Sequence, residues 1–134
     1  MKDHAAIVIR KGKQILFIRR SEKKKILPNI WSFPSGTREE HEDIFMTAQR
    51  EAEEELGVAV KVEKKLTTTD LTDFKVRLHF VLCSTAGEPF IKDQNEIGAL
   101  NWFTFEQFFD KYKDEEIGHG LQFLRKNPQY WKGL

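Results

Sequence analysis

The chain of 134 residues is 40% hydrophobic, 32% charged and 12% aromatic, a composition that indicates one folded core and excludes a disordered protein. Its net charge of +1 gives no general attraction to nucleic acid or to an anionic membrane, so we expect neither DNA binding nor membrane attachment. Cys83 is the only cysteine, and no apolar run is long enough for a signal peptide or a membrane span. We therefore expect a single domain over residues 1–134, located in the cytoplasm.

The N-terminal part of the chain predicts a β-hairpin followed by a basic loop. Ala5–Ile9 and Ile15–Ile18 are short apolar runs rich in β-branched residues, and Lys11–Lys13 with its central glycine separates them. This pattern is typical of two paired strands. The loop predicted over Ser21–Asn29 contains three lysines and a proline. Its positive charges serve either to contact phosphate groups or only to keep the loop soluble.

The strongest helical pattern lies in the middle of the chain. A short strand is expected at Trp31–Phe33, and Ser35–Gly36 after it permits a tight bend. Over Asp43–Leu56 the apolar residues recur at helical spacing, and Gly57 is the expected stop. The apolar stripe of this helix consists of Ile44, Phe45, Ala48, Ala52 and Leu56.

The remaining chain predicts four strands and two helices. Val58–Val62, Leu66–Thr69 and Leu100–Phe103 are short runs typical of strands, and Phe74–Cys83 alternates between apolar and polar residues. A helix follows from the capping box of Thr104 and Gln107 and the aromatic residues after it. A last short helix includes Leu121, Phe123 and Leu124, and ends at Asn127 and Pro128. Strands interspersed with helices predict an α/β or α+β architecture, with helices that cover a mixed sheet.

Three carboxylates on the central helix indicate a cation site. Successive helical residues turn by about 100°, so Glu51, Glu54 and Glu55 share one side of the helix, whereas Glu53 points away. Their mutual repulsion would be relieved by a cation. Carboxylate oxygens suit Mg²⁺ or Mn²⁺, and no cluster of histidine or cysteine competes as a zinc site. The alternative is a solvated acidic face.

The spacing around these glutamates forms a complete motif. Gly36 is followed after five residues by Glu42 and, after seven more, by Arg50–Val58, which reads Arg-Glu-Ala-Glu-Glu-Glu-Leu-Gly-Val. This arrangement resembles the Nudix box, G-x5-E-x7-R-E-U-x-E-E-x-G-U with U an aliphatic residue, at every fixed position. Ser35 and His41 depart from the family pattern, because they stand where the family often has glycine.

The resemblance extends beyond the motif on both sides. Upstream, Trp31–Pro34 stands where Nudix hydrolases usually have similar residues, and downstream Glu96 and Trp102–Phe103 do the same. Trp31 and Phe33 either stack on a nucleotide base or belong to the core.

The family likeness implies an α/β/α sandwich with a mixed β-sheet and the hydrolysis of a pyrophosphate bond in a nucleoside diphosphate linked to another group. It implies Mg²⁺ or Mn²⁺ as cofactor and a small-molecule nucleotide, foremost a nucleoside triphosphate, as substrate. The metal ligands that it implies are Glu51, Glu55, Glu54, Glu42 through water, and the Ser35 carbonyl. The catalytic residues that we expect are Glu54, as further ligand or base, Arg50, which orients the glutamates, and Glu96 as base or additional ligand.

Two other functions stay open. The first is a catalytically inactive Nudix-like module that binds nucleotides or RNA as a sensor; such modules typically lose box carboxylates, which this chain keeps. The second is a coenzyme A or dinucleoside polyphosphate pyrophosphatase. An ADP-ribose hydrolase is disfavoured because Phe74 stands where those enzymes have a proline.

Overall fold

The computed structural model describes all 134 residues and contains seven strands and three α-helices. The elements are β1 (Lys2–Lys11), β2 (Gln14–Arg20), β3 (Trp31–Ser32), β4 (Ser35–Thr37), α1 (Ile44–Leu56), β5 (Lys61–Leu71), β6 (Val76–Ser84), β7 (Ile97–Phe103), α2 (Phe105–Lys111) and α3 (His119–Lys126). Short 3₁₀ turns lie at Thr72–Phe74, Asp114–Glu116 and Pro128–Tyr130. The helices all fall short of the length and apolar character that a bilayer span requires.

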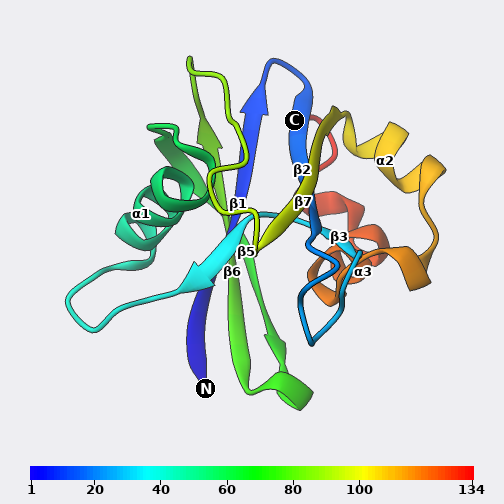
Figure 1. The fold of residues 1–134 in the computed structure, drawn as a ribbon. Coiled ribbons are helices and arrows are strands. Elements are labelled where there is room, and N and C mark those ends of the chain that lie inside the picture. The colour runs from blue at the N-terminus through cyan, green and yellow to red at the C-terminus, as the bar shows by residue number, and fades with distance from the viewer.

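Strand β1 is the centre of the sheet. It runs parallel to β6 along its whole length, and β5 pairs antiparallel with the far edge of β6. On its other side β1 pairs with β2 only at the hairpin end, next to a turn in which Gly12 has a φ of 59°. Beyond that end the two strands separate: β4 pairs with β1, whereas β3 and β7 pair with β2 (Figure 1).

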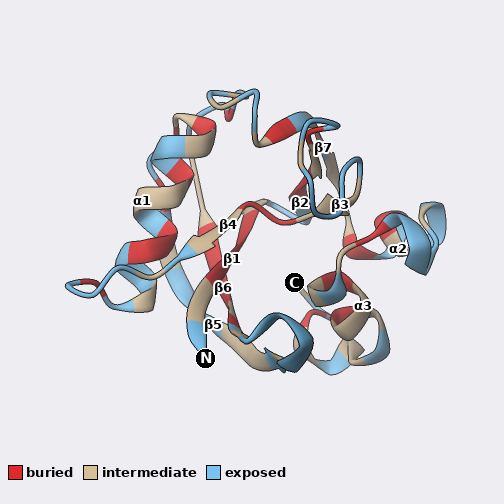
Figure 2. Cartoon of the chain, turned by 60° about the horizontal axis from the view of Figure 1, so that its bottom comes forward, coloured by how far each residue is buried: buried red, intermediate tan, exposed pale blue.

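Helices cover both faces of the sheet, which confirms the α/β/α sandwich (Figure 1). Alternate residues of a strand point to opposite faces, and both sets are buried in β1. Ala5, Ile7 and Ile9 join the core beneath α1. Ala6 and Val8 join a second core beneath α2 and α3. The buried residues accordingly follow the central strands and the inner sides of the helices (Figure 2).

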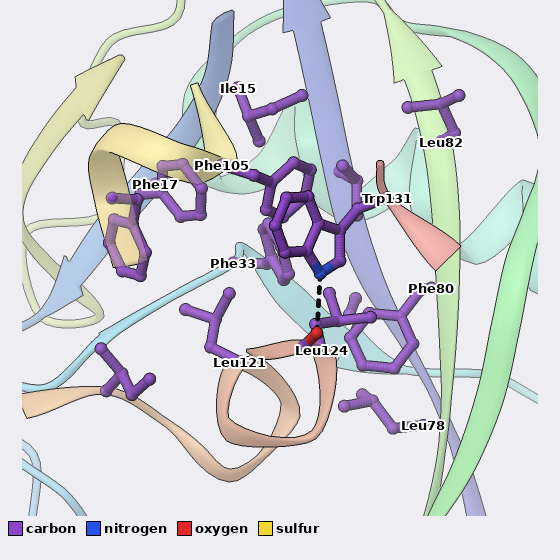
Figure 3. Close-up of a cluster of buried hydrophobic side chains, with 14 residues drawn as sticks. Ile15, Phe17, Phe33, Leu78, Phe80, Leu82, Phe105, Leu121, Leu124 and Trp131 are labelled. Atoms are coloured by element: carbon purple, nitrogen blue, oxygen red, sulfur yellow. Dashed lines mark hydrogen bonds between the residues drawn. The ribbon is translucent and has the colours of Figure 1, made fainter. Parts of the chain in front are cut away.

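Aromatic rings dominate the core beneath α2 and α3 (Figure 3). The ring of Phe17 stacks on those of Phe108 and Phe33, with centroid distances of 3.9 Å and 5.4 Å. The Trp131 indole donates a 2.7 Å hydrogen bond from Nε1 to the Leu124 carbonyl, so its polar atom is satisfied within the core. Truncation of such a buried ring costs about 3–5 kcal/mol of stability, and this core therefore fixes the C-terminal helices on the sheet.

The predicted hairpin, central helix, capping box and last helix are confirmed. The two strands expected at Val58–Val62 and Leu66–Thr69 are instead the single strand β5, which begins at Lys61 and contains two irregularities in its register. Val58 and Val60 are buried in the core beneath α1 without belonging to a strand. Their apolar character reflects burial in a connecting segment, which strand propensity cannot distinguish from burial in a sheet.

Two further boundaries differ from the sequence prediction. Ser35–Gly36, expected as a bend, belongs to strand β4. The strand expected from Phe74 begins at Val76, because Phe74 ends a 3₁₀ turn and Lys75 adopts a left-handed conformation with a φ of 55°. Phe45, assigned to the apolar stripe of the central helix, is 39% exposed.

Candidate metal centre

The position of α1 fixes the row of acidic residues. The helix begins where the Asp43 side chain accepts a 2.8 Å hydrogen bond from the Met46 N–H. It ends at Gly57, whose φ of 63° lies in the left-handed region that favours glycine. Thr47, Ala48, Ala52 and Leu56 are buried against the sheet. The remaining side of the helix carries the three glutamates of the predicted cation site.

Arg50 joins three of the acidic residues. Its Nε and Nη2 donate hydrogen bonds of 2.7 Å and 3.0 Å to the two carboxylate oxygens of Glu42. Its Nη1 donates to Glu51 at 2.9 Å and to Glu54 at 3.2 Å. Nη2 also donates to the Thr37 carbonyl in β4. Arg50 therefore holds these carboxylates in place and ties α1 to the neighbouring strand.

Glu42 is the most completely satisfied of these carboxylates. Its side chain is 4% exposed, and besides Arg50 it accepts hydrogen bonds from the Glu39 N–H and the Thr47 hydroxyl, each at 3.0 Å. The Arg50 hydrogen bonds lower the pKa of Glu42 to about 2. Both of its oxygens are thus engaged within the protein.

Glu51 packs directly against β4. A Cβ atom at Gly36 would lie 2.1 Å from the Glu51 carboxyl carbon, so any larger residue at this position would force the Glu51 side chain to move. The φ of Gly36 is not positive, and the residue is required by space and not by backbone conformation. The Glu51 side chain is 14% exposed, and burial raises the pKa of its carboxyl.

Glu55 is the carboxylate that lacks a partner. Its Oε2 atom is buried and accepts no hydrogen bond, and no Lys or Arg forms an ion pair with it. Burial, followed by the charges of Glu51, Glu96 and Asp93, raises its pKa to about 8. A buried acid surrounded by other acids is unstable as an anion unless a cation compensates it. By contrast, Glu53 was predicted to point away from this group, and its carboxylate lies 3.7 Å from the Lys92 ammonium.

Glu96 approaches the same group from the loop before β7. Its backbone N–H donates to the Asp93 carbonyl at 3.2 Å, and its charge contributes to the raised pKa of Glu55. Its carboxylate accepts two hydrogen bonds from the Lys24 ammonium. The structure therefore brings together Glu51, Glu54, Glu55 and Glu96, which lie on two segments separated by 40 residues of sequence.

The donors in this group fit a hard divalent cation. The orphaned Glu55 oxygen and the adjacent carboxylates are the oxygen ligands that Mg²⁺ and Mn²⁺ prefer. A different group, formed by Glu39, His41 and Glu42, places its ligand atoms within 4.8 Å of one another. There Glu42 is engaged by Arg50, whereas Glu39 and His41 are exposed. The group around Glu55 is consequently the better candidate.

A cavity of about 290 Å³ opens on the other side of β4. Ser35 lines it and lies opposite Ala6, whereas Gly36 lies opposite Ala5 and faces α1. The cavity wall is mainly apolar, and Phe74 and His119 contribute rings whose centroids are 4.9 Å apart. The sequence did not identify this cavity, because its wall combines residues from distant segments.

Four other residues with aromatic, thiol or imidazole side chains have structural roles. Phe33 is buried in the core, and Trp31 packs against Tyr112 with a centroid distance of 5.2 Å. Cys83 is buried, and burial raises the pKa of its thiol to about 12. His79 bonds to Asp3 through Nε2 at 2.7 Å. None of these residues contacts the group of carboxylates through a hydrogen bond or ion pair.

Comparison with known proteins gives a consistent result. The family model for the NUDIX domain matches residues 2–123. The chain is 30% identical over 76 residues to an 8-oxo-dGTP diphosphatase of Buchnera aphidicola, and the match covers 57% of each protein. It is 28% identical over 113 residues to Nudix hydrolase 6 of Arabidopsis thaliana, with 80% of this chain and 40% of that protein covered. The chain thus spans about half the length of these relatives.

The fold has close counterparts among solved structures. A MutT NUDIX hydrolase from Burkholderia pseudomallei superposes with a TM-score of 0.75 at 23% identity, over 93% of this chain and 95% of that one. The MutT protein from Methanosarcina mazei Go1 superposes with a TM-score of 0.77 at 16% identity, over 98% and 95% of the two chains. These likenesses confirm the architecture of the sheet and its helices.

Proposed function

Because the chain belongs to the NUDIX domain family, we propose that it is a divalent-metal-dependent pyrophosphohydrolase that cleaves a phosphoric anhydride bond of a nucleoside triphosphate. The observation that carries this proposal is the buried, unpartnered Oε2 of Glu55 within a group of carboxylates. Such a group destabilises the folded protein when its carboxylates are ionised and uncompensated. A cation bound there compensates their charge.

The carboxylates and Arg50 have complementary tasks in this proposal. Glu51 and Glu55 are the principal ligands, and Glu54 is available as a third. Mg²⁺ or Mn²⁺, when bound, neutralises the phosphate oxygens and lowers the pKa of a water molecule. Arg50 restricts the Glu51 and Glu54 side chains through its 2.9 Å and 3.2 Å hydrogen bonds, so less freedom is lost on binding. Glu42 acts chiefly as the anchor of Arg50.

The proton of the attacking water requires an acceptor. Glu54 and Glu96 are the two carboxylates available for this task, because Glu51 and Glu55 are assigned to the cation and Glu42 is fully hydrogen-bonded. Glu54 is 57% exposed and belongs to the helix, whereas Glu96 approaches from the opposite loop. The variants Glu54→Gln and Glu96→Gln distinguish them, since loss of a general base typically lowers turnover by about 10²–10⁴-fold.

The apolar cavity beside β4 is suited to the nucleoside. Its volume of about 290 Å³ lies at the lower end of the range for small-molecule sites. A base there would contact the rings of Phe74 and His119, while the phosphate chain extends past β4 toward Glu51. The relative from Buchnera is named for a nucleoside triphosphate, which supports this substrate class.

The test is a nucleotide panel assayed with Mg²⁺. It includes nucleoside triphosphates, dinucleoside polyphosphates, nucleotide sugars and coenzyme A, scored for release of pyrophosphate or phosphate. We expect turnover of a triphosphate, loss of turnover after chelation, and incorporation of oxygen from labelled water into a phosphate product. Nucleotide binding without hydrolysis of any compound would refute the proposal in favour of a sensor module.

A further inference from the structure

Lys24 joins the loop after β2 to the group of carboxylates. Its Nζ atom lies 2.8 Å from both carboxylate oxygens of Glu96. The contact is reinforced by the Ser21 N–H, which donates to the Glu96 carbonyl at 2.9 Å, and by the Lys24 N–H, which donates to the Ser21 carbonyl. The ammonium of Lys24 therefore forms an ion pair with the Glu96 carboxylate, which is proposed above as a candidate general base.

Two cationic side chains neutralise carboxylates at opposite ends of the candidate site. Arg50 pairs with Glu42, Glu51 and Glu54 at one end. Lys24 is the cation at the other end, where it pairs with Glu96. Glu55, between them, has no cationic partner. A divalent cation at Glu55 would therefore lie near Glu96 and compete electrostatically with Lys24 for its charge.

The same loop borders the apolar cavity. Ile26 and Leu27 line the cavity wall, and their carbonyls accept hydrogen bonds of 2.8 Å and 3.1 Å from the Arg20 guanidinium. The backbone of the loop is thus anchored on β2, whereas the Lys24 ammonium is carried on a flexible four-carbon stem. One loop therefore contacts both places, because Ile26 and Leu27 line the cavity and Lys24 contacts Glu96.

We propose that Lys24 exchanges partners on substrate binding: it neutralises Glu96 before the cation and nucleotide bind, and then its ammonium binds phosphate oxygens and leaves Glu96 free to act on the water. This inference rests on the proposed function. The Lys24 and Glu96 side chains are 25% and 40% exposed, and an ion pair with that exposure is weak and easily exchanged. A phosphate chain carries more negative charge than one carboxylate, and an ammonium group binds it as a compact point charge.

The experiment compares Lys24→Gln with Lys23→Gln. The two variants lose the same charge at neighbouring positions, but the Lys23 side chain is exposed and forms no ion pair. Mn²⁺ affinity is measured without nucleotide by electron paramagnetic resonance, and KM and kcat are measured with a triphosphate. Thermal melts verify folding, and Lys24→Ala provides a second variant that lacks the ammonium.

We expect Lys24→Gln to shift the two affinities in opposite directions. Mn²⁺ should bind about two- to fivefold more tightly, the scale of one exposed ion pair. KM should rise about tenfold, the scale of one charge-assisted contact. Lys23→Gln should change both quantities less than about twofold, and Lys24→Arg should stay closer to the wild type than Lys24→Gln does.

Three results would overturn the inference. If Lys24→Gln weakens both Mn²⁺ and nucleotide binding, Lys24 only supports the loop. If Lys24→Gln and Lys23→Gln behave alike, the effect is one of general surface charge. If the wild-type protein binds no Mn²⁺, the proposed function itself fails, and this outcome is distinguishable because it does not depend on any variant.

Discussion

Glu55→Gln is expected to stabilise the protein in the absence of divalent cations and to remove most of its turnover. Burial and the neighbouring acids raise the pKa of Glu55 from 4.5 to about 8, so the folded state retains a proton that the unfolded chain releases. The free energy of unfolding therefore falls as pH rises from 4.5 to 8. At pH 7 the raised pKa of Glu55 lowers the free energy of unfolding by about 3 kcal/mol, because each pKa unit corresponds to about 1.4 kcal/mol.

Glutamine has nearly the same volume as glutamate and no charge, so this penalty disappears in the variant. For a chain of this size, each kcal/mol corresponds to roughly 3–5 °C in Tm. In chelator, the Tm of the wild-type protein should decrease between pH 5 and pH 8, while that of Glu55→Gln should change less and exceed the wild-type value at pH 8. Glu53→Gln, altered on the outer side of α1, should follow the wild-type curve.

The stabilisation produced by Mg²⁺ distinguishes a carboxylate that binds the cation from one that only supports the fold. At a concentration of 100 Kd it should stabilise the wild-type protein by about 2.7 kcal/mol and should stabilise Glu55→Gln less. Turnover of the variant should fall by at least about 10²-fold, the scale of a lost electrostatic group. A variant that is less stable than wild type at pH 8 in chelator would refute the reasoning from burial. Retained turnover and a full Mg²⁺ shift would refute the assignment of Glu55 as a ligand.

Three further changes test the surroundings of the site. Gly36→Ala should lower kcat by about 10²-fold while circular dichroism shows an intact fold, because the new Cβ must displace the Glu51 carboxylate; wild-type kcat would show that Glu51 can move without consequence. In Glu42→Gln, stability should decrease less than in the wild type as pH falls from 4.5 to 2, because the Glu42 carboxyl with its lowered pKa stabilises the protein only while it is ionised. Identical acid unfolding curves for variant and wild type would contradict this. Glu96→Gln should lower turnover by about 10²-fold if Glu96 is the base, and a decrease below about threefold in a folded variant would assign that role to Glu54.

The sequence predicted the elements whose signals are local. The helix Ile44–Leu56 has a capping aspartate, a periodic apolar face and a terminal glycine, and each of these features can be recognised within a few residues. Strand β4 was missed because it is three residues long and pairs with β1, some thirty residues earlier in the chain. Its partner supplies the reason for its extended conformation, and no local pattern can show that.

For the candidate site, too, the sequence predicted only the features that depend on local geometry. The shared side of Glu51, Glu54 and Glu55 follows from helical geometry, and Arg50 was expected to orient them. That Gly36 is required by the Glu51 side chain, and not by a bend, depends on the packing of a strand on a helix. The contact of Lys24 with Glu96 spans 72 positions, so the sequence left the lysine as one of several charges in a basic loop.

Strand β4 has a consequence for how this protein can change over evolutionary time. Neighbouring residues of the strand serve different parts of the molecule, since Ser35 borders the cavity and Gly36 borders Glu51. Substitutions elsewhere in the cavity wall, at Phe74 or His119, can alter which compounds fit without disturbing the acidic side of α1. An insertion or deletion of one residue within Ser35–Thr37 would exchange the two faces and disrupt both parts at once. Homologous chains should therefore vary freely in the cavity wall but keep the length of this short strand and its spacing to Glu42 constant.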